Sequence, residues 1–347
     1  MKRLIRILKM KTTMEMKVMR KKPAGTSSFV STQSCHWQLP IIIIIILIHK
    51  KPYFCHPYKD NCMKILNGSA LSKKIKSVLA IEIEYLLKKN ERAPKLCIIL
   101  VGDDPANTSY VKSKKKSCNE IGILCDLEIL PYSTSQDELL LLIEKLNHDN
   151  ETDGILVQLP LPKHIDQQTI IQSIDYKKDV DGLHPMNVGL LNVSNDAIIP
   201  CTPKGILSLL KAEGVSITGK HCVVIGRSNL VGKPMAQLMI KENASVTVCH
   251  SKTRDLPYLT RQGEILIIAI GHPNLVNANM LKEGAVVVDV GINNVDGKLV
   301  GDIYNSIDVT DIEKKAAAIT PVPGGVGPMT IASLLENVVE VYKKNMA

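Results

Sequence analysis

Large aromatic side chains are almost absent from most of this 347-residue chain. The only Trp and both Phe residues, Trp37, Phe29 and Phe54, lie before residue 63, and Tyr is the only large aromatic residue after it. Met63 opens "MKILNGSALSKKI", which is typical of a natural protein start. Two compositions joined in one chain predict an extension over residues 1–62, followed by a folded body that begins at Met63.

The body also lacks an excess of charge of one sign. Residues 1–62 hold 12 of the 43 Lys and Arg residues but only two of the 34 Asp and Glu residues, so the formal net charge of +9 comes entirely from this segment. The body carries 31 basic and 32 acidic side chains. A near-neutral body offers no broad basic face to a polyanion, which argues against nucleic acid as its partner.

A run long enough to cross a membrane is missing as well. The strongest candidate is "PIIIIIILI" at residues 40–48, which is shorter than the roughly 20 apolar residues that a spanning helix needs. It also begins too far into the chain for a secretory signal. The basic first 22 residues leave a transit peptide open, beside the alternative of an upstream start codon. The body is predicted to be cytoplasmic and to make no membrane contact.

The cysteines show no disulfide framework. They number nine, an odd count, and they are widely scattered. The Cys and His residues of the extension follow no metal-ligand spacing, and no metal site is predicted. The cysteines of the body lie mostly in apolar runs and are predicted to be buried, reduced thiols as in a cytosol-like compartment. They are Cys97, Cys118, Cys125, Cys201, Cys222 and Cys249.

The body alternates helix patterns with apolar strand patterns, which predicts an α/β fold with parallel sheets. In its first half, Ser135 and Glu138 form a capping box at the start of a helix. In its second half, Thr202 is predicted to be an N-cap and Pro203 the first helical residue. The predicted helices of the first half cover 69–89, 107–121 and "QDELLLLIEKL", and its predicted strands cover 96–102, 125–130 and 154–162.

The second half has the pattern of a Rossmann-like domain. Four buried strands are predicted, with helices between them. A Gly/Pro loop at 319–330 and a final helix, "IASLLENVVEVYKK", follow. The four strands are 221–226, 245–250, 264–271 and 285–293.

The stretch "VVIGRSNLVGKP" in this half predicts a dinucleotide site. Gly226 allows a tight turn where the strand ends, and Gly232 opens the next helix. The free N–H groups and positive dipole end at the start of a helix suit a pyrophosphate. As a bare pattern, G-x5-G also fits an ordinary turn between a strand and a helix.

The next strand decides between NAD and NADP. In an NAD site, an acidic residue about 20 positions further on binds the ribose hydroxyls. Here the second strand ends in "CHSKT" at residues 249–253, which contains no acid. Arg227 and Ser251 can hold a 2′-phosphate, which a carboxylate would repel. The sequence therefore predicts NADP as the cofactor.

The stretch "TSYVKSKKKS" at 108–117 has four lysines within five positions. At about 100° per residue, Tyr110 and Lys114 lie about 40° apart on a helix, on the face that turns inward, whereas the other three lysines point elsewhere. A partly buried lysine has a lowered pKa and can exchange protons near neutrality. The alternative is a lysine whose alkyl stem merely covers the core.

Three other features of the body suggest a ligand site. Gln158 ends an apolar strand, where open α/β sheets bind ligands, and its amide can orient an ammonium group. "KDVDGLHP" places Asp179 and Asp181 on a turn, where either one could be only a turn or cap residue. "PVPGGVGPMT" carries three glycines, as expected where a backbone must approach something flat or charged.

Eight blocks of the body, in order, resemble the bifunctional methylenetetrahydrofolate dehydrogenase/cyclohydrolase family, the FolD family. The resemblance runs from about Met63 to the C-terminus, and nothing before Met63 takes part in it. The blocks are "SYVKSKK", "GILVQLPLP", "KDVDGLHPMNVG", "PCTPKG", "VVIGRSNLVGKPMA", "TVCHSKT", "DVGIN" and "TPVPGGVGPMT".

The resemblance implies a set of catalytic and folate-binding residues. Lys114 is implied as the central catalytic residue, with Gln158 positioning it. Tyr110 is implied to stack on the folate, and Asp181 to hydrogen-bond the pterin. The implied lining of the folate site also includes Pro323, Gly324 and Gly325. The implied contacts to NADP are Gly226, Arg227, Ser228, Ser251 and Ile292.

The resemblance also implies two domains: an N-terminal α/β folate-binding domain completed by the C-terminal helix, and a Rossmann-like NADP-binding domain that forms a homodimer. The expected division is an extension over 1–62 outside the fold, a catalytic domain over 63–200, an NADP-binding domain over 201–319, and a returning loop and helix over 320–347.

The implied function is NADP-dependent oxidation of 5,10-methylenetetrahydrofolate to 5,10-methenyltetrahydrofolate, followed by hydrolysis to 10-formyltetrahydrofolate. The principal alternative is a monofunctional dehydrogenase of the same fold. A non-catalytic NADP-binding protein leaves the Tyr110, Lys114, Gln158 and Asp181 set without a purpose. An unrelated Rossmann dehydrogenase acting on small acids leaves "PVPGGVGPMT" unexplained.

Overall fold

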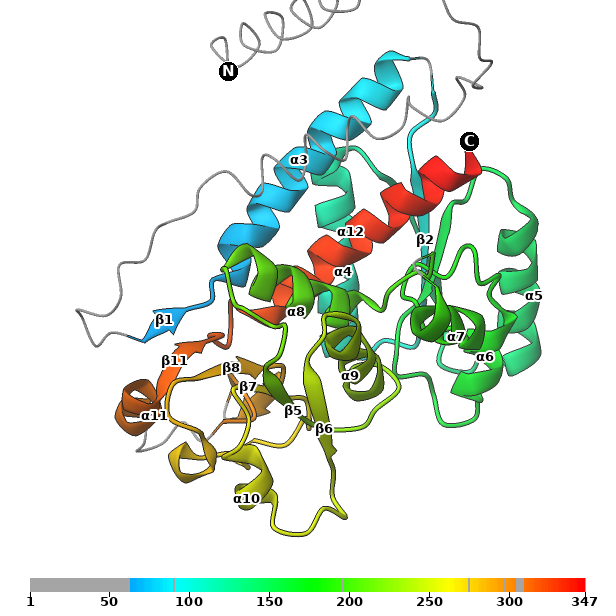
Figure 1. Cartoon of the computed structure of the whole chain (residues 1–347). Helices are drawn as coiled ribbons and strands as arrows, with labels where there is room; N and C mark the ends of the chain where they lie inside the picture. Colours follow the sequence, from blue (N-terminus) through cyan, green and yellow to red (C-terminus); the bar gives the residue numbers. More distant parts are fainter. Residues whose placement is uncertain are drawn as a thin grey trace, which may run out of the picture. The chain divides into compact units, whose positions relative to one another are not determined.

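Figure 1 shows the helices and strands of the chain in a computed structural model. The structure describes residues 63–89, 91–194, 196–273, 275–295, 297–303 and 309–346. The predicted extension and its apolar run lie outside these ranges. Within the ranges, no helix is both long and apolar enough to cross a bilayer.

A three-stranded parallel sheet forms the first half of the body. Its central strand is β2 (Lys95–Val101), which pairs with β3 (Leu124–Leu130) on one side and β4 (Gly154–Val157) on the other. Leu96–Val101 are all buried, as expected for a strand covered on both faces. The helices of this half are α3 (Gly68–Lys88), α4 (Pro105–Ile121), α5 (Gln136–His148), α6 (Gln167–Ser173) and α7 (Pro185–Val193).

Local signals in the sequence explain where the longer helices begin and end. Asn67 caps α3 by accepting a hydrogen bond from the backbone N–H of Ala70 at 2.9 Å. The predicted capping box of α5 is confirmed, because Ser135 accepts from the backbone of Glu138 while the Glu138 carboxylate accepts from the backbone of Ser135. Gly122 ends α4 in the left-handed conformation.

A six-stranded parallel sheet forms the second half, in the order β1-β11-β8-β7-β5-β6. Four of its strands are those predicted from the sequence: β5 (His221–Ile225), β6 (Ser245–Cys249), β7 (Ile265–Ile268) and β8 (Ala285–Asp289). The other two are β1 (Lys64–Ile65) and β11 (Ala316–Ile319). The remaining elements are α8 (Cys201–Ala212), α9 (Gly232–Lys241), α10 (Leu256–Thr260), the 3₁₀ helix η1 (Ala278–Met280), the hairpin of β9 (Asn293–Val295) and β10 (Lys298–Val300), and α11 (Val309–Lys315).

The last helix, α12 (Val326–Asn345), packs against α3 and α8, as Figure 1 shows. One hydrophobic core cluster contains Leu79 of α3, Leu210 of α8 and Leu335 of α12. The end of the chain therefore packs onto the beginning of the body. The six cysteines of the body are buried and unpaired, which confirms the prediction of buried thiols.

Several element boundaries differ from those predicted. β4 ends at Val157, five residues before the predicted end, so Gln158 follows the strand. Pro160 and Pro162 have no N–H to offer a sheet, which explains the early end. α12 begins at Val326, inside the stretch 319–330 predicted as a loop. The loop between β11 and α12 is therefore only residues 320–325.

The start of α8 is a correction to the prediction. The N-cap is Pro200, so Thr202 is already the second helical residue and Pro203 the third. The Thr202 hydroxyl does not cap the helix. It forms a hydrogen bond of 3.0 Å with the Thr330 hydroxyl of α12, so a tertiary contact replaces the predicted local one.

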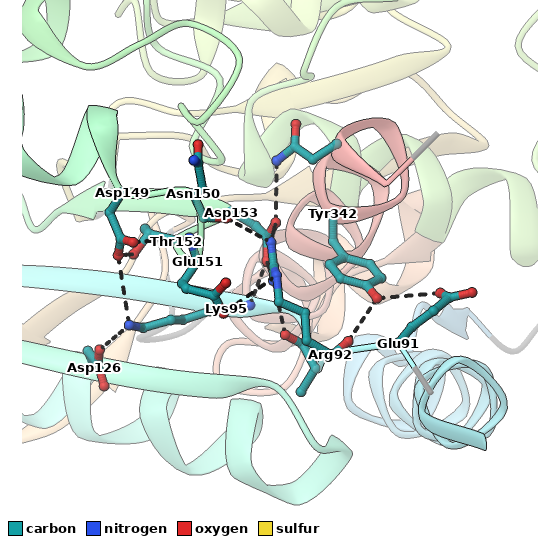
Figure 2. A network of polar contacts seen from close by, with 12 residues as sticks. Glu91, Arg92, Lys95, Asp126, Asp149, Asn150, Glu151, Thr152, Asp153 and Tyr342 are labelled. Carbon is teal, nitrogen blue, oxygen red and sulfur yellow. Dashed lines mark hydrogen bonds and ion pairs between the residues drawn. The ribbon is translucent and has the colours of Figure 1, made fainter. Parts of the chain in front are cut away.

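A buried polar network fastens α12 to the segment before β2 (Figure 2). The Arg92 guanidinium donates to both carboxylate oxygens of Asp153, at 2.7 and 2.8 Å, and the side chain of Asp153 is fully buried. Asp153 also accepts from the backbone N–H of Lys95. The Tyr342 hydroxyl of α12 donates to the Arg92 carbonyl at 2.8 Å. Asp126 lies at the exposed edge of the network, 3.0 Å from the Lys95 ammonium.

Replacing the buried acid should destabilise the fold strongly. Asp153→Ala removes the carboxylate that pairs with the Arg92 guanidinium and accepts from the Lys95 N–H, and we expect a loss of about 3 kcal/mol in the free energy of unfolding. The matched control is Asp126→Ala, which breaks an exposed ion pair and should change this free energy by less than about 1 kcal/mol. Urea unfolding at pH 7 measures both, and equal losses would contradict the assigned roles.

Candidate active site

The helix α4 turns one lysine of its basic run into the interior. Asp104 caps the helix by accepting from the backbone N–H of Asn107 at 2.8 Å, and Pro105 occupies the first turn. Lys114 is only 6% exposed, whereas Lys112 and Lys116 are exposed. This is the orientation that helical periodicity predicts.

The Lys114 amine has a fixed polar partner. Its Nζ donates to Oε1 of Gln158 at 3.0 Å, and both side chains are buried. The Gln158 Nε2 donates to the Leu159 carbonyl at 2.7 Å, and the Gln158 backbone N–H donates to the carbonyl of Ile99 in β2. Because an ammonium can only donate, these bonds fix the amide with its oxygen toward Lys114.

Burial and a nearby carboxylate act on the Lys114 amine in opposite directions. Burial lowers its pKa below the ordinary value, and the negative charge of Asp181 partly offsets this shift. The ring of Tyr110 lies with its centroid 4.8 Å from Nζ. Burial raises the pKa of Tyr110, so its phenol stays neutral. The amine is thus surrounded by an amide, an aromatic ring and a carboxylate.

The two acids of the turn after β4 have different surroundings. Asp179 is 2% exposed and accepts hydrogen bonds from the backbone of Gly182 and His184 and from the Asn187 amide. Burial raises the pKa of Asp179 to about 6. Asp181 is half-buried, and its charge is the one that acts on Lys114. Asp179 therefore holds the turn, whereas Asp181 lies close enough to Lys114 and Cys201 to influence the pKa of both.

Cys201 is a neighbour of this cluster that the sequence analysis did not single out. Its thiol donates to the Val180 carbonyl at 3.3 Å, and burial together with the charge of Asp181 raises its pKa. The available signal was its place in the block "PCTPKG". The separation of Cys201 and Asp181 in the sequence gives no indication that the two side chains lie close together.

The turn between β5 and α9 brings two glycines into backbone contact. Gly226 has φ +118°, and a Cβ there would overlap the Ala269 carbonyl oxygen. A Cβ on Gly232 would overlap the Gly226 carbonyl oxygen. Ser228 accepts from the backbone N–H groups of Val231 and Gly232 at 3.2 and 3.4 Å. Only glycine fits at both ends of this turn.

This turn suits a dinucleotide phosphate. Arg227 and Ser228 are exposed on it, directly before the positive end of the ten-residue helix α9. Because β5 and β6 are parallel neighbours, Ser251 follows β6 at the same edge of the sheet, and it is also exposed. No acid lies between Cys249 and Thr253 that would repel a 2′-phosphate.

A cavity of about 490 Å³ joins the remaining predicted residues. It brings Ile292, which follows β8, together with Pro323, Gly324 and Gly325, which precede α12. Gly324 has φ +107°, and a Cβ on Gly68 of α3 would overlap the Gly325 carbonyl oxygen. The loop therefore packs backbone to backbone against the start of α3, which leaves its other side to line the cavity.

Two buried acids shape the wall of this cavity. Asp289 accepts from the backbone N–H groups of Gly291, Asp302 and Ile303. Burial raises the pKa of Asp289 to about 6. Asp302 in turn accepts from the backbone of Ile270 and from the Asn293 amide. The turn that carries Ile292 is thus held by carboxylates from two segments.

The predicted residues form three groups in the structure. One group surrounds the Lys114 amine, the second lines the cavity, and the third lies on the β5–α9 turn and after β6. The helix α12 links the first two groups, because its first turn lines the cavity and its Thr330 bonds to Thr202, next to Cys201. Among the described residues, no cluster of His, Cys, Asp or Glu could hold a metal ion.

The six-stranded parallel sheet and the glycine turn between β5 and α9 are features of α/β proteins that bind a dinucleotide. Two family models match the chain: the tetrahydrofolate dehydrogenase/cyclohydrolase catalytic domain over residues 66–181, and the NAD(P)-binding domain of the same family over residues 200–346. The chain belongs to the tetrahydrofolate dehydrogenase/cyclohydrolase family. The predictions of this family, of its α/β fold and of its NAD(P)-dependent folate chemistry are confirmed.

Individual relatives agree with this assignment. The bifunctional protein FolD of Acetivibrio thermocellus is 53% identical over 281 residues, which cover 81% of this chain and 97% of the relative. The structure of the bifunctional FolD dehydrogenase/cyclohydrolase of Campylobacter jejuni is 51% identical, with a TM-score of 0.79 over 81% of this chain and 99% of that chain.

A relative with bound cofactor is also similar. The methylenetetrahydrofolate dehydrogenase-cyclohydrolase of Trypanosoma brucei, complexed with NADP and an inhibitor, is 37% identical. The match has a TM-score of 0.78 and covers 82% of this chain and 99% of that chain. The cofactor in that relative is the one predicted here from the absence of an acid after β6.

Proposed function

We propose that this chain oxidises 5,10-methylenetetrahydrofolate with NADP and then hydrolyses the 5,10-methenyltetrahydrofolate formed to 10-formyltetrahydrofolate. Family membership supports both steps. The observation that carries the proposal is the buried Lys114 amine, held 3.0 Å from Gln158 and under the influence of Asp181. A buried lysine amine that is held by an amide and lies near a carboxylate is suited to proton transfer.

The oxidation needs alignment more than acid–base chemistry. Bound NADP supplies the acceptor for the hydride that leaves the methylene carbon. The two nitrogens beside that carbon stabilise the resulting cation through their lone pairs. The chain's part is to hold the substrate, with the Tyr110 ring stacked on it and Asp181 hydrogen-bonded to the pterin. Pro323, Gly324 and Gly325 line the same folate site.

The hydrolysis needs proton transfers. Water adds to the methenyl carbon and loses one proton, which leaves a hydroxyl on that carbon. The hydroxyl then loses its own proton as the formyl C=O forms, while one C–N bond breaks and its nitrogen gains a proton. The net reaction releases one proton. Lys114 is the candidate for the transfers, because burial lowers its pKa toward neutrality. Gln158 keeps the amine aimed at the reacting carbon.

A coupled assay tests the proposal and separates it from a monofunctional dehydrogenase. Purified protein is given methylenetetrahydrofolate and NADP, and the formation of NADPH and of formyltetrahydrofolate is followed together. We expect both products, with enzyme-dependent formyltetrahydrofolate formation from added methenyltetrahydrofolate as well. NADPH formation with only the spontaneous rate of hydrolysis would favour the monofunctional alternative.

We assign the cofactor preference to residues that follow β5 and β6 of the six-stranded sheet. Gly226, Arg227, Ser228 and Ser251 are proposed to contact NADP around its phosphates, and Ile292 to contact it from the cavity wall. Arg227 and Ser251 are exposed at one sheet edge, which supports a site for the 2′-phosphate.

An acid placed after β6 should strongly reduce this preference. The wild-type protein should have a kcat/KM for NADP at least about tenfold above that for NAD, and Ser251→Asp should lower it for NADP by about tenfold through repulsion of the 2′-phosphate. Ser245→Asp, at the other end of β6, is the matched control and should change neither value. Similar wild-type efficiencies with both dinucleotides would contradict the assignment.

We also propose a domain division, an oligomeric state and a location for the enzyme. We place residues 63–200 in the catalytic domain, 201–319 in the NADP-binding domain and 320–347 in the returning segment. The two family matches support the boundary near residue 200, and the packing of α12 on α3 supports a last segment that returns to the first half. The protein is expected to be a cytoplasmic homodimer, and its buried unpaired thiols are consistent with a reducing compartment. A transit peptide in residues 1–62 remains the alternative.

A further inference from the structure

One buried amide connects α12 to the two chain segments behind the reacting cluster. Asn337 is 1% exposed. Its Nδ2 donates to the Val180 carbonyl at 2.8 Å and to the Ile199 carbonyl at 2.9 Å, and lies 3.6 Å from the Cys201 thiol. Its Oδ1 accepts from the Lys204 ammonium at 2.8 Å. All these partners lie more than 130 residues away in the chain.

The orientation of this amide is determined by chemistry. An ammonium can only donate, so the Asn337 oxygen must face Lys204, and both N–H donors then face the two carbonyls. Lys204 is itself anchored to Glu340 at 2.9 Å. Burial lowers the pKa of Lys204, but the charges of Glu340 and Glu336 outweigh this effect and raise it, so the ammonium stays charged.

The segments that Asn337 holds carry the groups around the reacting amine. Val180 immediately precedes Asp181, and its carbonyl accepts from both Asn337 and Cys201. A Cβ on Gly182 would lie 2.7 Å from the Ile198 carbonyl oxygen, so the two segments touch through their backbones. A shift at Asn337 would therefore move the backbone that sets the position of Asp181.

We propose that Asn337 is a positioning residue for folate, acting through Asp181. This inference rests on the proposed function, since it assigns a role within the same site. By holding the Val180 carbonyl, Asn337 fixes the distance from the Asp181 carboxylate to the pterin and to the Lys114 amine. The hydrogen-bond partners of this amide are Lys204, Val180, Ile199 and Cys201, none of which lies on the turn after β5, so the effect should be confined to folate.

The test compares two substitutions on α12. Asn337→Leu removes both donors while keeping the branched shape of the side chain, and should raise the KM for methylenetetrahydrofolate about tenfold, while the KM for NADP stays within about twofold of wild type. Tyr342→Phe is the matched control, because it removes another buried bond from α12 to a backbone carbonyl, that of Arg92 (Figure 2). It should lower the unfolding midpoint and leave both KM values within about twofold.

A double variant separates positioning from general support. If Asn337 acts through Asp181, adding Asn337→Leu to Asp181→Ala should raise the folate KM by no more than about twofold beyond Asp181→Ala alone. The proposal would be overturned if the increases in folate KM of the two single variants multiply in the double variant. It would also be overturned if the Asn337→Leu protein folds and has the wild-type folate KM, or if its folate and NADP KM values rise equally.

A second variant decides if Asn337→Leu does not fold. Lys204→Met keeps both carbonyl bonds but removes the partner that orients the amide, and should raise the folate KM about threefold with the NADP KM unchanged. A wild-type folate KM in this variant would overturn the role of Asn337. If the wild-type protein itself forms no NADPH with methylenetetrahydrofolate, the proposed function fails instead, so the two failures can be told apart.

Discussion

Lys114→Met is expected to lower the cyclohydrolase rate by about a thousandfold while folate binding is retained. Methionine fills the same buried space without a charge or a proton, so the folate pocket should keep its shape. The loss follows because neither Gln158 nor the neutral phenol of Tyr110 can replace an amine with a lowered pKa. Formation of formyltetrahydrofolate from methenyltetrahydrofolate measures the rate, and equilibrium titration with folate measures binding.

The same helix offers the control for this prediction. Lys112→Met changes an exposed lysine two residues away, on the opposite side of α4, and should leave both measurements at wild-type values. The pair distinguishes the position of one amine from the charge of the whole basic run. A Lys114→Met protein that hydrolyses at the wild-type rate would remove Lys114 from the proton-transfer role.

Gly226→Ala is expected to raise the KM for NADP about a hundredfold. The added methyl group would overlap the Ala269 carbonyl oxygen, and φ of +118° strains any residue with a side chain. The turn must therefore move at the point where the backbone approaches the pyrophosphate, and a strain of about 3 kcal/mol corresponds to about a hundredfold in affinity. Initial rates with varied NADP at saturating folate measure the change.

A second glycine shows what strain alone would do. Gly219 also has a positive φ, of +76°, but a Cβ there would meet nothing within 4 Å. Gly219→Ala should lower the free energy of unfolding by about 1 kcal/mol and leave the KM for NADP unchanged. Equal effects of the two substitutions on the KM would indicate general destabilisation and contradict the cofactor role of the β5–α9 turn.

The longer elements could be predicted from the sequence because their patterns are local. Helical periodicity placed Lys114 inside and Lys112 outside, and the capping box at Ser135 placed the start of α5. The two-residue strand β1 could not be predicted, because so short a segment has no period to detect. Thr202 was assigned wrongly as an N-cap, because its hydroxyl has a tertiary partner in Thr330 that no local rule supplies.

The site could be predicted only in part for the same reason. The resemblance to the family pointed to the residues whose types and spacing recur in its motifs. The different surroundings of Asp179 and Asp181, and the bonds of Asn337 to Val180, arise from contacts between distant segments. The extension over 1–62 lies outside the described residues, and its interpretation stays a prediction.

Direct titration of the Lys114 amine tests the central claim, that burial and Asp181 together tune this group. Heteronuclear NMR of protein labelled at lysine Nζ would follow it, with Lys114→Met providing the assignment. We predict a pKa below the ordinary 10.5, falling further in Asp181→Asn, because loss of the carboxylate removes the charge that favours the ammonium. A pKa at or above 10.5, or one that Asp181→Asn leaves unchanged, would contradict the account.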